Sequence, residues 1–378
     1  MGDAAQRLVA IAFHETSVGG ASQSILRMLP LLEQAGWSFT CWTPGPGELR
    51  EELQARGLAV TGSERLLRYH WRTLREPPGA LRRLVSVPGY LREFRAWVRD
   101  RDPAVLHANT LLTLPEAVSA RRRRPTVLYC HETVPAGAQG AVVARLARRA
   151  ADVLVGISDA STAELRHRGL SPLIVPNGVP LPDLPPPRAR PPAPLVIGTL
   201  GTVCRRKGSD LFVAAAERLQ AELPDADFRL IGPLVPGPEH AWAERLVDGA
   251  RRRGVRTGVA PEPYAELSEW DIAVIPSRDE PFGLVAAEAM AVGVPVVAAR
   301  VGGLPDVVGT DAGVLVAPED PEALAQAILG LARDEAKRSA RGHAGRARVE
   351  TRFTLEAQAA GVNGAYLTAL RSADRAGA

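Results

Sequence analysis

Short apolar runs alternate with longer amphipathic segments along most of the chain. In the first half, apolar runs typical of buried strands occupy residues 8–13, 38–42, 105–108, 126–130, 153–157 and 173–175. Apolar positions with helical spacing lie between them, at residues 21–35, 81–101, 140–150 and 159–168. Because strands that alternate with helices form parallel sheets, this half is predicted to be an α/β domain.

The same alternation resumes after a proline-rich stretch. Residues 182–194 read PDLPPPRARPPAP, which neither a helix nor a central strand accommodates. Beyond it, strands are predicted at 195–200, 228–231, 272–275, 295–299 and 314–316, and helices at 209–222, 239–252, 284–292 and 321–333. The predicted organisation is a first domain at 1–183, a linker at 184–194 and a second domain at 195–354, followed by a C-terminal helix and tail at 355–378 that could pack back on the first domain.

Length and composition fit a folded protein of two or three domains. The chain has 378 residues, of which 46% are hydrophobic and 23% charged, and domains average roughly 150 residues. Its three cysteines lie far apart, which argues against a disulfide framework and against a zinc site. The apolar run at 8–13 is too short for a secretory signal, and no stretch reaches the roughly 18 apolar residues of a membrane span. The expected location is the cytoplasm.

Arginine supplies nearly all of the positive charge. Only Lys207 and Lys337 are lysines among 46 basic residues, and the formal net charge is +4. Up to Asp183 there are 23 arginines against 17 acidic residues, and after it 23 basic against 25 acidic residues. The first domain is therefore predicted to be basic and the second slightly acidic.

One basic stretch of the first domain, residues 65–101, also carries aromatic side chains. It holds ten arginines, with Tyr69, Trp71, Tyr90 and Trp97 between them. One interpretation is a solvated helix whose aromatic residues face the core. The other is a surface that meets anionic lipid headgroups or a phosphorylated acceptor at the inner face of the cell membrane. Nucleic acid is not expected as a partner, because no known binding motif accompanies the charge.

The strongest candidate site is the sequence from Glu280 to Glu288, EPFGLVAAE, which follows the strand at 272–275. Gly283 lets another group approach the backbone, and the first turn of the helix that begins there offers free N–H groups to an anion. The two carboxylates suit a ligand rich in hydroxyl groups. A glycosidase-like acid and nucleophile would need carboxyl groups about 5 Å apart or further, which spacing along the chain does not decide. The plain alternative is that both are ordinary helix charges.

A second candidate site is the basic loop GTVCRRKG, residues 201–208, which follows the first strand of the second domain. Arg205, Arg206 and Lys207 are three cations between two glycines, at the place where a doubly wound sheet holds a diphosphate. The loop is neither a Walker sequence nor a GxGxxG sequence. The alternative is a solvated basic loop.

The first domain carries weaker signals at the ends of its predicted strands. His14, Glu15 and Ser22 surround the glycine pair Gly19-Gly20, whose backbone a ligand could approach closely. His131 ends the strand at 126–130, where a structural role is as common as a functional one.

Together these segments resemble retaining glycosyltransferases of family 4, whose GT-B fold has two Rossmann-like, doubly wound parallel-sheet domains facing across a cleft. The resemblance covers nearly the whole chain. The matching residues are Gly19-Gly20, His131, Ser158, Val175-Pro-Asn-Gly-Val179, Arg205-Arg206-Lys207-Gly208, Tyr264, Trp270-Asp271, Pro276-Ser277, Glu280 with Glu288, Gly293-Val-Pro-Val-Val297 and Gly302-Gly303.

The resemblance implies roles for some of these positions. The second domain would bind a nucleotide-activated sugar, and the first would bind the acceptor, with His14, Glu15 and Ser22 on the acceptor side. The implied donor-site residues are Lys207 with Arg205 or Arg206 on the diphosphate, backbone N–H groups of Phe282, Gly283 and Leu284, Glu280 on the sugar hydroxyls, Glu288 on the ribose, His131 beside the donor sugar, and Gly19 and Gly20 near the phosphates. The family places an Arg where this sequence has Thr202, so either Arg205 or Arg206 takes over its role or the diphosphate is held by a weaker set of cations.

The implied activity is transfer of a hexose from a nucleoside-diphosphate sugar to a glycan, lipid-linked or small-molecule acceptor, with retention at the anomeric carbon. The enzyme would be a metal-independent hexosyltransferase of polysaccharide or glycoconjugate biosynthesis, with no cofactor. Asp225-Ala-Asp227 resembles a metal-holding pair of other sugar transferases, but it follows Pro224 in a turn, where Asp is favoured without a metal. The alternatives are a GT-B relative such as a nucleotide-sugar epimerase or a phosphorylase, and a sugar-nucleotide binding module without turnover.

Overall fold

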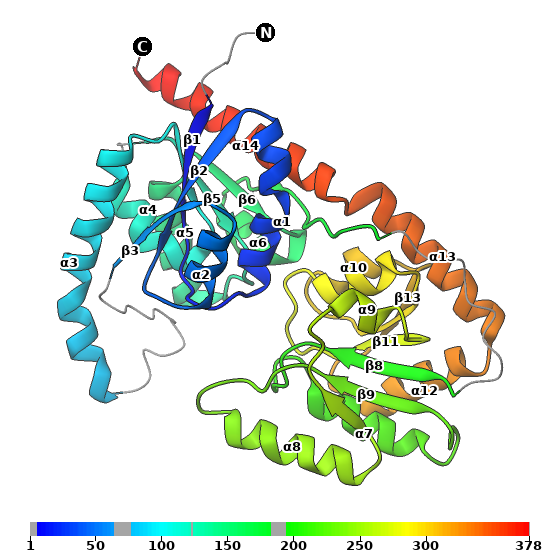
Figure 1. The fold of residues 1–378 in the computed structure, drawn as a ribbon. Coiled ribbons are helices and arrows are strands. Elements are labelled where there is room, and N and C mark those ends of the chain that lie inside the picture. Colours follow the sequence, from blue (N-terminus) through cyan, green and yellow to red (C-terminus); the bar gives the residue numbers. More distant parts are fainter. Residues whose placement is uncertain (1–5, 64–76, 122–123, 183–193, 378) are drawn as a thin grey trace. The chain divides into compact units, whose positions relative to one another are not determined.

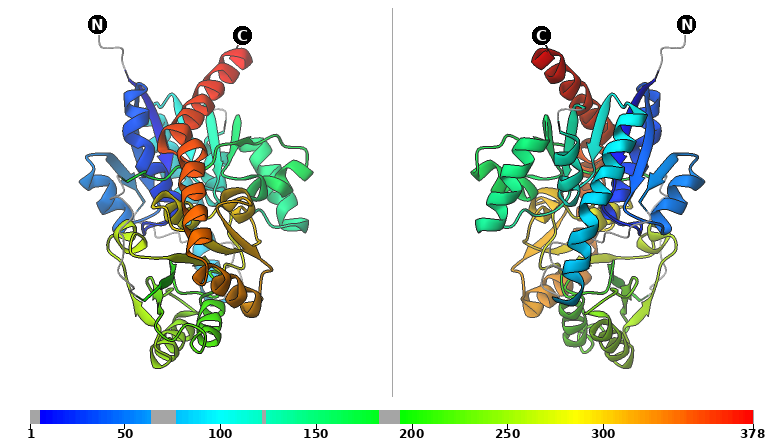
Figure 2. Two further views of the ribbon diagram at one scale, coloured as in Figure 1. Left: turned by 90° about the vertical axis from the view of Figure 1, so that its right-hand side faces the viewer. Right: turned by 90° about the vertical axis from the view of Figure 1, so that its left-hand side faces the viewer.

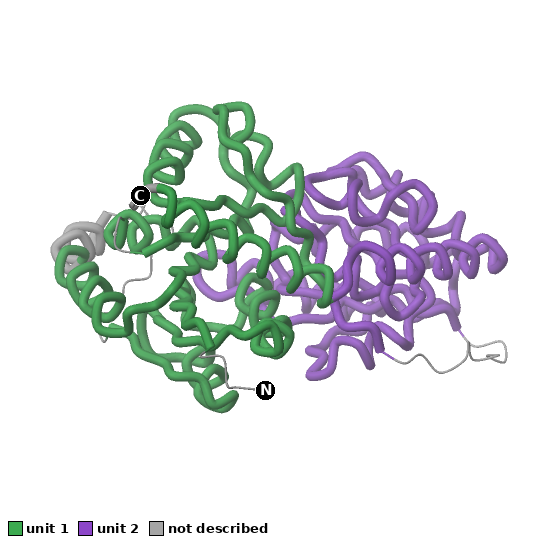
Figure 3. Tube along the Cα trace, turned by 90° about the horizontal axis from the view of Figure 1, so that it is seen from above, with its two compact units in different colours: residues 1–178, 355–378 green, residues 179–354 purple. Residues whose placement is uncertain are grey.

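The chain folds into two compact units. A computed structural model describes residues 6–63, 77–121, 124–182 and 194–377, and their side chains except at 77–86 and 376–377. Unit 1 comprises Met1–Gly178 and Leu355–Ala378, and unit 2 comprises Val179–Thr354 (Figure 3). The linker predicted at 184–194 falls almost wholly outside the described residues.

Seven parallel strands form the sheet within the described part of unit 1 (Figure 1). They are β1 (Arg7–Ala12), β2 (Trp37–Thr43), β3 (Ala59–Gly62), β4 (Val105–Ala108), β5 (Thr126–Cys130), β6 (Val153–Gly156) and β7 (Leu173–Ile174). Their order in the sheet is β3-β2-β1-β4-β5-β6-β7. From β1 the strands continue through β2 to β3 at one edge, and from β4 they continue through β5 and β6 to β7 at the other edge. The direction in which strands are added therefore reverses between β1 and β4. Ligands of such sheets bind at this switch point, beyond the carboxyl ends of the strands.

Helices cover both faces of this sheet. They are α1 (Gly20–Gln34), α2 (Glu48–Ala55), α3 (Pro77–Arg101), α4 (Leu114–Ala120), α5 (Gly137–Ala150), α6 (Asp159–His167) and α14 (Leu355–Gly377), with a 3₁₀ turn η2 (Leu111–Thr113). Alternate strand residues point to one face, where Trp42, Phe94 and Leu106 join β2, α3 and β4 in one core. The opposite views of Figure 2 place α14 and α3 in front in turn, so these helices lie on opposite faces.

A buried polar network fixes the C-terminal helix α14 to unit 1. The Gln358 side chain donates to Ser24 Oγ at 2.7 Å and accepts from the backbone N–H of Gly178 at 2.8 Å. Further along α14, Tyr366 OH bonds His107 Nδ1 at 2.8 Å. Because a buried polar group without a partner costs about 1–3 kcal/mol, these contacts select one position for the helix.

Unit 2 repeats the doubly wound design with six parallel strands among its described residues. They are β8 (Val196–Leu200), β9 (Asp227–Ile231), β10 (Arg256–Gly258), β11 (Ile272–Ile275), β12 (Val296–Ala299) and β13 (Gly313–Val316), in the order β10-β9-β8-β11-β12-β13. The switch point lies between β8 and β11. The structure thus confirms the prediction of two α/β domains with doubly wound parallel sheets.

The helices of unit 2 also lie on both faces of their sheet (Figure 1). They are α7 (Ser209–Leu219), α8 (His240–Arg252), α9 (Pro263–Leu267), α10 (Leu284–Ala291), α11 (Leu304–Val308), α12 (Pro321–Ala332) and α13 (Glu335–Arg352). Phe212, Val247 and Ile328 bring α7, α8 and α12 into one core. The remaining face carries α10, which packs against α13 and α11.

The basic segment at 65–101 is only partly described, and its described aromatic residues are not on the surface. Tyr90 and Trp97 are 1% and 5% exposed and pack around Trp42 in the core. A surface role for these two is therefore wrong, while Tyr69 and Trp71 lie outside the described residues. Among the described residues, no helix has both the length and the apolar character needed to cross a membrane.

Candidate functional site

The donor-site candidates of unit 2 gather at the switch point of its sheet. The loop after β8 carries the three cations, and the loop after β11 carries Ser277 and Glu280. Because β8 and β11 are hydrogen-bonded neighbours, their carboxyl ends bring the two loops together.

Lys207 and Glu280 form an ion pair between these two loops. Lys207 Nζ lies 2.6 Å from Glu280 Oε2, and Ser277 Oγ donates to the same oxygen at 3.4 Å. The side chains are 23% and 10% exposed. A cation and a carboxylate thus lie side by side at the switch point, and their roles toward a phosphate and a sugar stay predictions.

The two arginines of the basic loop have different surroundings. The Arg205 guanidinium stacks on the Trp242 ring at 4.6 Å, and its backbone N–H donates to Glu239 Oε2 at 3.1 Å. Arg206 Nη1 instead donates to the carbonyl of Asp279, next to Glu280, at 3.1 Å. Arg206 therefore points toward the Glu280 loop, and Arg205 toward α8.

The Glu280 turn is built on glycine contacts. A Cβ atom on Gly302, whose φ is +52°, would lie 2.0 Å from the carbonyl oxygen of Glu280. The N–H of Gly303 donates to that oxygen at 2.9 Å. Gly283 caps α10 with a φ of +110°, which only glycine adopts readily. Phe282 is buried against Phe353, with ring centroids 5.6 Å apart.

Glu288 lies on α10, one turn after Leu284, and is 6% exposed. It is thus an inward-facing carboxylate on the helix that begins at Gly283, and not an ordinary solvated helix charge.

In unit 1, the corresponding switch point lies between β1 and β4. His14 follows β1 and Thr110 follows β4, and His14 Nδ1 is 2.9 Å from Thr110 Oγ1. This pair joins the two loops much as Lys207 and Glu280 do in unit 2.

Glu15, Gly19 and Ser22 build the start of α1. Glu15 Oε1 accepts from the Ser22 backbone N–H at 3.1 Å, and Ser22 Oγ accepts from the Gly19 N–H at 2.9 Å. Burial raises the pKa of Glu15, although the hydrogen bonds from Ser22 oppose this. Gly19 has an ordinary φ of −118° and Gly20 is the first residue of the helix. Glu15 and Ser22 therefore cap α1, and their acceptor-side role stays a prediction.

His131 is buried at the end of β5 with an unsatisfied nitrogen. Its Nε2 has no hydrogen-bond partner among the described residues, and its ring packs on Tyr129 with centroids 4.4 Å apart. Burial, together with His107 and His14, lowers its pKa to about 3. A neutral ring with an unpaired buried nitrogen is unusual in a purely structural histidine, because such atoms normally find a partner.

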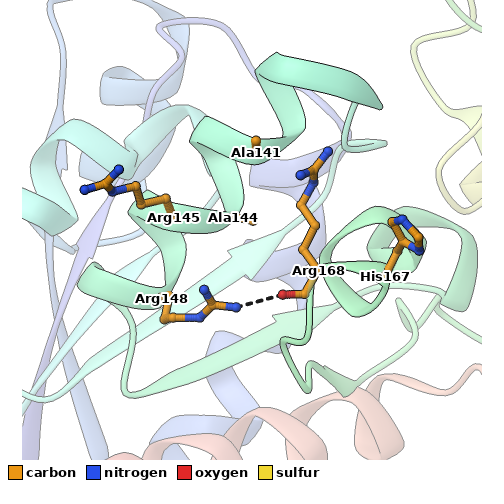
Figure 4. A pocket seen from close by; sticks show the side chains of 6 residues that line it. All are labelled: Ala141, Ala144, Arg145, Arg148, His167 and Arg168. Atoms are coloured by element: carbon orange, nitrogen blue, oxygen red, sulfur yellow. Dashed lines mark hydrogen bonds between the residues drawn. The ribbon is translucent and has the colours of Figure 1, made fainter.

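Two hollows lie on unit 1. One, of about 330 Å³ between α1 and α2, is lined by Val18, Gln23, Leu26, Arg27, Glu48, Glu52 and Arg56. The other, of about 560 Å³ between α5 and α6, is lined mainly by basic residues (Figure 4). There Arg148 donates to the carbonyl of Arg168, Arg168 pairs with Glu164, and Arg145 points away from both. The second hollow therefore lacks a converging set of cations.

Two residues of these loops were missed from the sequence. Thr110 follows a predicted strand next to Asn109, and Arg278 stands between Ser277 and Glu280. Each follows a strand at the switch point of its sheet, and this position could have marked both as candidate site residues.

Profiles of known families match both units of the chain. The profile described as Glycosyltransferase Family 4 matches residues 18–182, and the one described as Glycosyl transferases group 1 matches residues 194–334. D-inositol 3-phosphate glycosyltransferase 2 of Catenulispora acidiphila is 41% identical over an alignment of 155 positions, and the match covers 37% of this chain and only 36% of that protein. Glycogen synthase of Mycobacterium tuberculosis is 30% identical over an alignment of 300 positions, and the match covers 72% of this chain and 70% of that protein.

Solved structures share the fold at low identity. Alr3699/HepE of Anabaena, solved in complex with UDP and glucose, has a TM-score of 0.78 at 20% identity and covers 95% of this chain and 99% of its own. Sucrose-phosphate synthase of Thermosynechococcus elongatus has a TM-score of 0.79 at 24% identity, with 96% and 98% covered. With its two doubly wound units, both family profiles and these relatives, the chain belongs to family 4 of the glycosyltransferases and has the GT-B fold.

Proposed function

We propose that the protein transfers a hexose from a nucleoside-diphosphate sugar to a hydroxyl group of an acceptor, with retention at the anomeric carbon. The observation that carries this proposal is the Lys207–Glu280 pair at the switch point of unit 2, beside the start of α10. The structural neighbour HepE supports the donor class, since it was solved in complex with UDP and glucose.

The leaving diphosphate sets the main demand of this reaction. Negative charge grows on its oxygens, and fixed cations and N–H groups stabilise such charge best when they are already in place. In the proposed site Lys207 and Arg206 supply the cations, and the N–H groups of Phe282, Gly283 and Leu284 supply the donors. Arg206 fills the place of the arginine missing at Thr202, because Arg205 is held on Trp242. No metal and no cofactor are required by this arrangement.

The remaining predicted residues orient the two substrates. Glu280 accepts hydroxyl groups of the transferred sugar, Glu288 accepts those of the ribose, and neutral His131 offers its unpaired Nε2 to the sugar. In the retaining reaction that we propose, the acceptor attacks from the face that the diphosphate leaves, and a phosphate oxygen takes the acceptor's proton. No protein nucleophile is then needed.

Acceptor recognition is assigned to unit 1. His14 and Thr110 stand at its switch point, and the hollow between α1 and α2 begins at Val18, next to Gly19. Its lining combines Gln23 with acidic and basic side chains, which suits a hydroxyl-rich acceptor such as a glycan or a polyol.

The test is a panel of UDP-, GDP- and ADP-sugars assayed for release of the nucleoside diphosphate, with and without acceptors and with a metal chelator. The proposal is supported if the nucleoside diphosphate is released only with an acceptor and at the same rate in the presence of the chelator. The glycosidic bond of the product should also have the same anomeric configuration as the donor. Binding without turnover would favour a binding module, release of sugar phosphate from a glycan would favour a phosphorylase, and a changed sugar on the nucleotide would favour an epimerase.

Membrane association remains a separate proposal. In the described part of the segment 65–101 it rests on exposed arginines such as Arg92 and Arg99, because the aromatic residues there are buried. Co-sedimentation with anionic and neutral vesicles, at low and high salt, tests it, and absence of binding to anionic vesicles would contradict it. A cytoplasmic location is proposed with it; Cys41, Cys130 and Cys204 are buried free thiols, as expected in a reducing compartment.

A further inference from the structure

We propose that Arg278 is the positioning residue that fixes the basic loop 201–208 in its binding geometry. Arg278 follows β11, yet it holds two consecutive carbonyls of the loop after β8. Its Nη1 donates to the carbonyl of Arg205 at 2.6 Å, and its backbone N–H donates to the carbonyl of Arg206 at 2.8 Å. One residue therefore ties the two halves of the donor site together.

Two acidic residues hold the Arg278 guanidinium in place. Asp210, in the first turn of α7, accepts one hydrogen bond at each carboxylate oxygen, from Nη1 at 2.8 Å and from Nη2 at 3.0 Å. Glu319, just before α12, accepts from Nε at 2.6 Å. The contact with Arg278 lowers the pKa of Asp210, although burial acts in the opposite direction. Only an arginine offers a planar fork for one carboxylate and further donors at the same time.

The position of Lys207 depends on these bonds. Lys207 directly follows the two held carbonyls, and Gly208 after it has a φ of +69° and packs on the Pro276 carbonyl. Glycines at 201 and 208 leave the loop backbone free to adopt other conformations, so the loop needs fixed points outside itself. With Arg205 and Arg206 held, the Lys207 side chain can reach Glu280 without a further ordering cost.

Only the kinetic prediction for Arg278 rests on the proposed function. We expect the variant Arg278→Lys to raise the KM for the nucleotide sugar and the Kd for the free nucleoside diphosphate by about 10-fold, with kcat reduced by a similar factor. In a Lys207→Ala background, the same change should cost less than about 3-fold, because only the part of its effect that passes through Arg206 remains. Equal effects in both backgrounds would overturn the proposal.

A second readout does not depend on activity. Amide hydrogen exchange over residues 203–208 should become faster in Arg278→Lys, and the matched variant Arg229→Lys should leave it unchanged. Arg229 is a suitable control because it also joins several acidic groups, Asp227 and Glu266 among them, and no residue of the basic loop. Unchanged exchange at 203–208 in Arg278→Lys would overturn the positioning role even if the enzyme proved to use another substrate class. If instead exchange rises but no nucleotide binds, the proposed function fails and the positioning role stands.

Discussion

At the residue scale, Lys207 pairs with Glu280 in the structure, and the proposed function gives it a second partner, the diphosphate of the donor. Without ligand it neutralises Glu280 at 2.6 Å, so neither charge stands alone in a half-buried region. In the proposed reaction, a diphosphate would share the ammonium group, and Glu280 would then be available to hydroxyl groups of the sugar.

Removing this cation should affect turnover far more than folding. We expect Lys207→Ala to lower kcat/KM by about 100- to 1000-fold, the usual loss for one charge-stabilising group. Release of nucleoside diphosphate measures it. Lys337→Ala is the matched control, because Lys337 is the other lysine of the chain and lies on the exposed start of α13. A Lys207→Ala enzyme with near wild-type activity would contradict the site.

His131 should act as a neutral hydrogen-bonding group and not as an acid or base. Its pKa near 3 keeps the ring uncharged throughout the range from pH 5 to pH 8. The loss of kcat/KM caused by His131→Asn should therefore be the same factor at pH 5.5 and at pH 8. A loss that grows at one end of this range would mean that the histidine titrates during catalysis.

At the element scale, the site depends on loops that only glycine permits. The loop containing Gly302 and Gly303 packs directly on the Glu280 backbone, with no room for a Cβ atom at Gly302. The orientation of Glu280 is therefore set by a loop that follows β12, two strands away from the basic loop.

Gly302→Ala should displace the Glu280 turn and reduce kcat/KM by at least about 10-fold, because the methyl group would lie 2.0 Å from the Glu280 carbonyl oxygen. Gly254→Ala serves as the control. Gly254 also has a positive φ, of +76°, but nothing lies within 4 Å of the added methyl group, so about 1 kcal/mol of stability and no activity should be lost. Steady-state kinetics and thermal unfolding of both variants separate the two effects.

The sequence predicted strands that contain an apolar run better than strands that lack one. The strands at Val105–Ala108, Thr126–Cys130 and Ile272–Ile275 have the predicted bounds, because central strands are continuous apolar runs. The edge strands β3 and β10 were missed, since both are short and largely solvent-accessible and carry no apolar run.

The same contrast applies to the candidate site. Lys207 and Glu280 could be placed together because each follows a strand at the switch point. The contacts of Arg278 could not be predicted, because its partners Asp210 and Glu319 belong to other elements that only the folded backbone brings near it. Glu15 likewise looked like a ligand contact, and only the structure reveals that its side chain folds back to cap α1.

At the scale of the whole molecule, the chain returns to its first unit at the end. Gln358 on α14 bonds the Gly178 backbone and Ser24, so it joins the last helix to α1 and to the end of the first segment of unit 1. Gln358→Leu would leave these buried groups unpaired and should cost about 3 kcal/mol of unfolding free energy. Gln326→Leu, on the exposed face of α12, should change it by less than about 0.5 kcal/mol. Urea unfolding of both variants tests the difference.

Buried titratable groups make opposing contributions to the pH dependence of unit 1. Burial lowers the pKa of His107 to about 4 and that of His131 to about 3, so the unfolded chain binds their protons first and stability falls as the pH drops below 6.5. Burial raises the pKa of Glu116 and Glu132 to about 7, so their folded forms hold protons more tightly and stability falls as the pH rises from 4.5 toward 7.

Each of these four groups changes the unfolding free energy by about 2 kcal/mol between pH 7 and pH 5. The histidine contributions and the glutamate contributions have opposite signs, so they nearly cancel in the wild-type protein. Glu116→Gln removes one of the opposing terms while the amide can still accept from Tyr90 OH, which lies 2.7 Å from Glu116 Oε1. The unfolding free energy of this variant should therefore fall by about 2 kcal/mol more than that of the wild type when the pH is lowered from 7 to 5. His131→Gln should shift the difference in the opposite direction. The unfolding free energies of the wild type and both variants are measured by urea unfolding as a function of pH. If the three profiles are parallel, the folded-state pKa values of Glu116 and His131 do not differ from those of the unfolded chain, which would contradict the assigned protonation states.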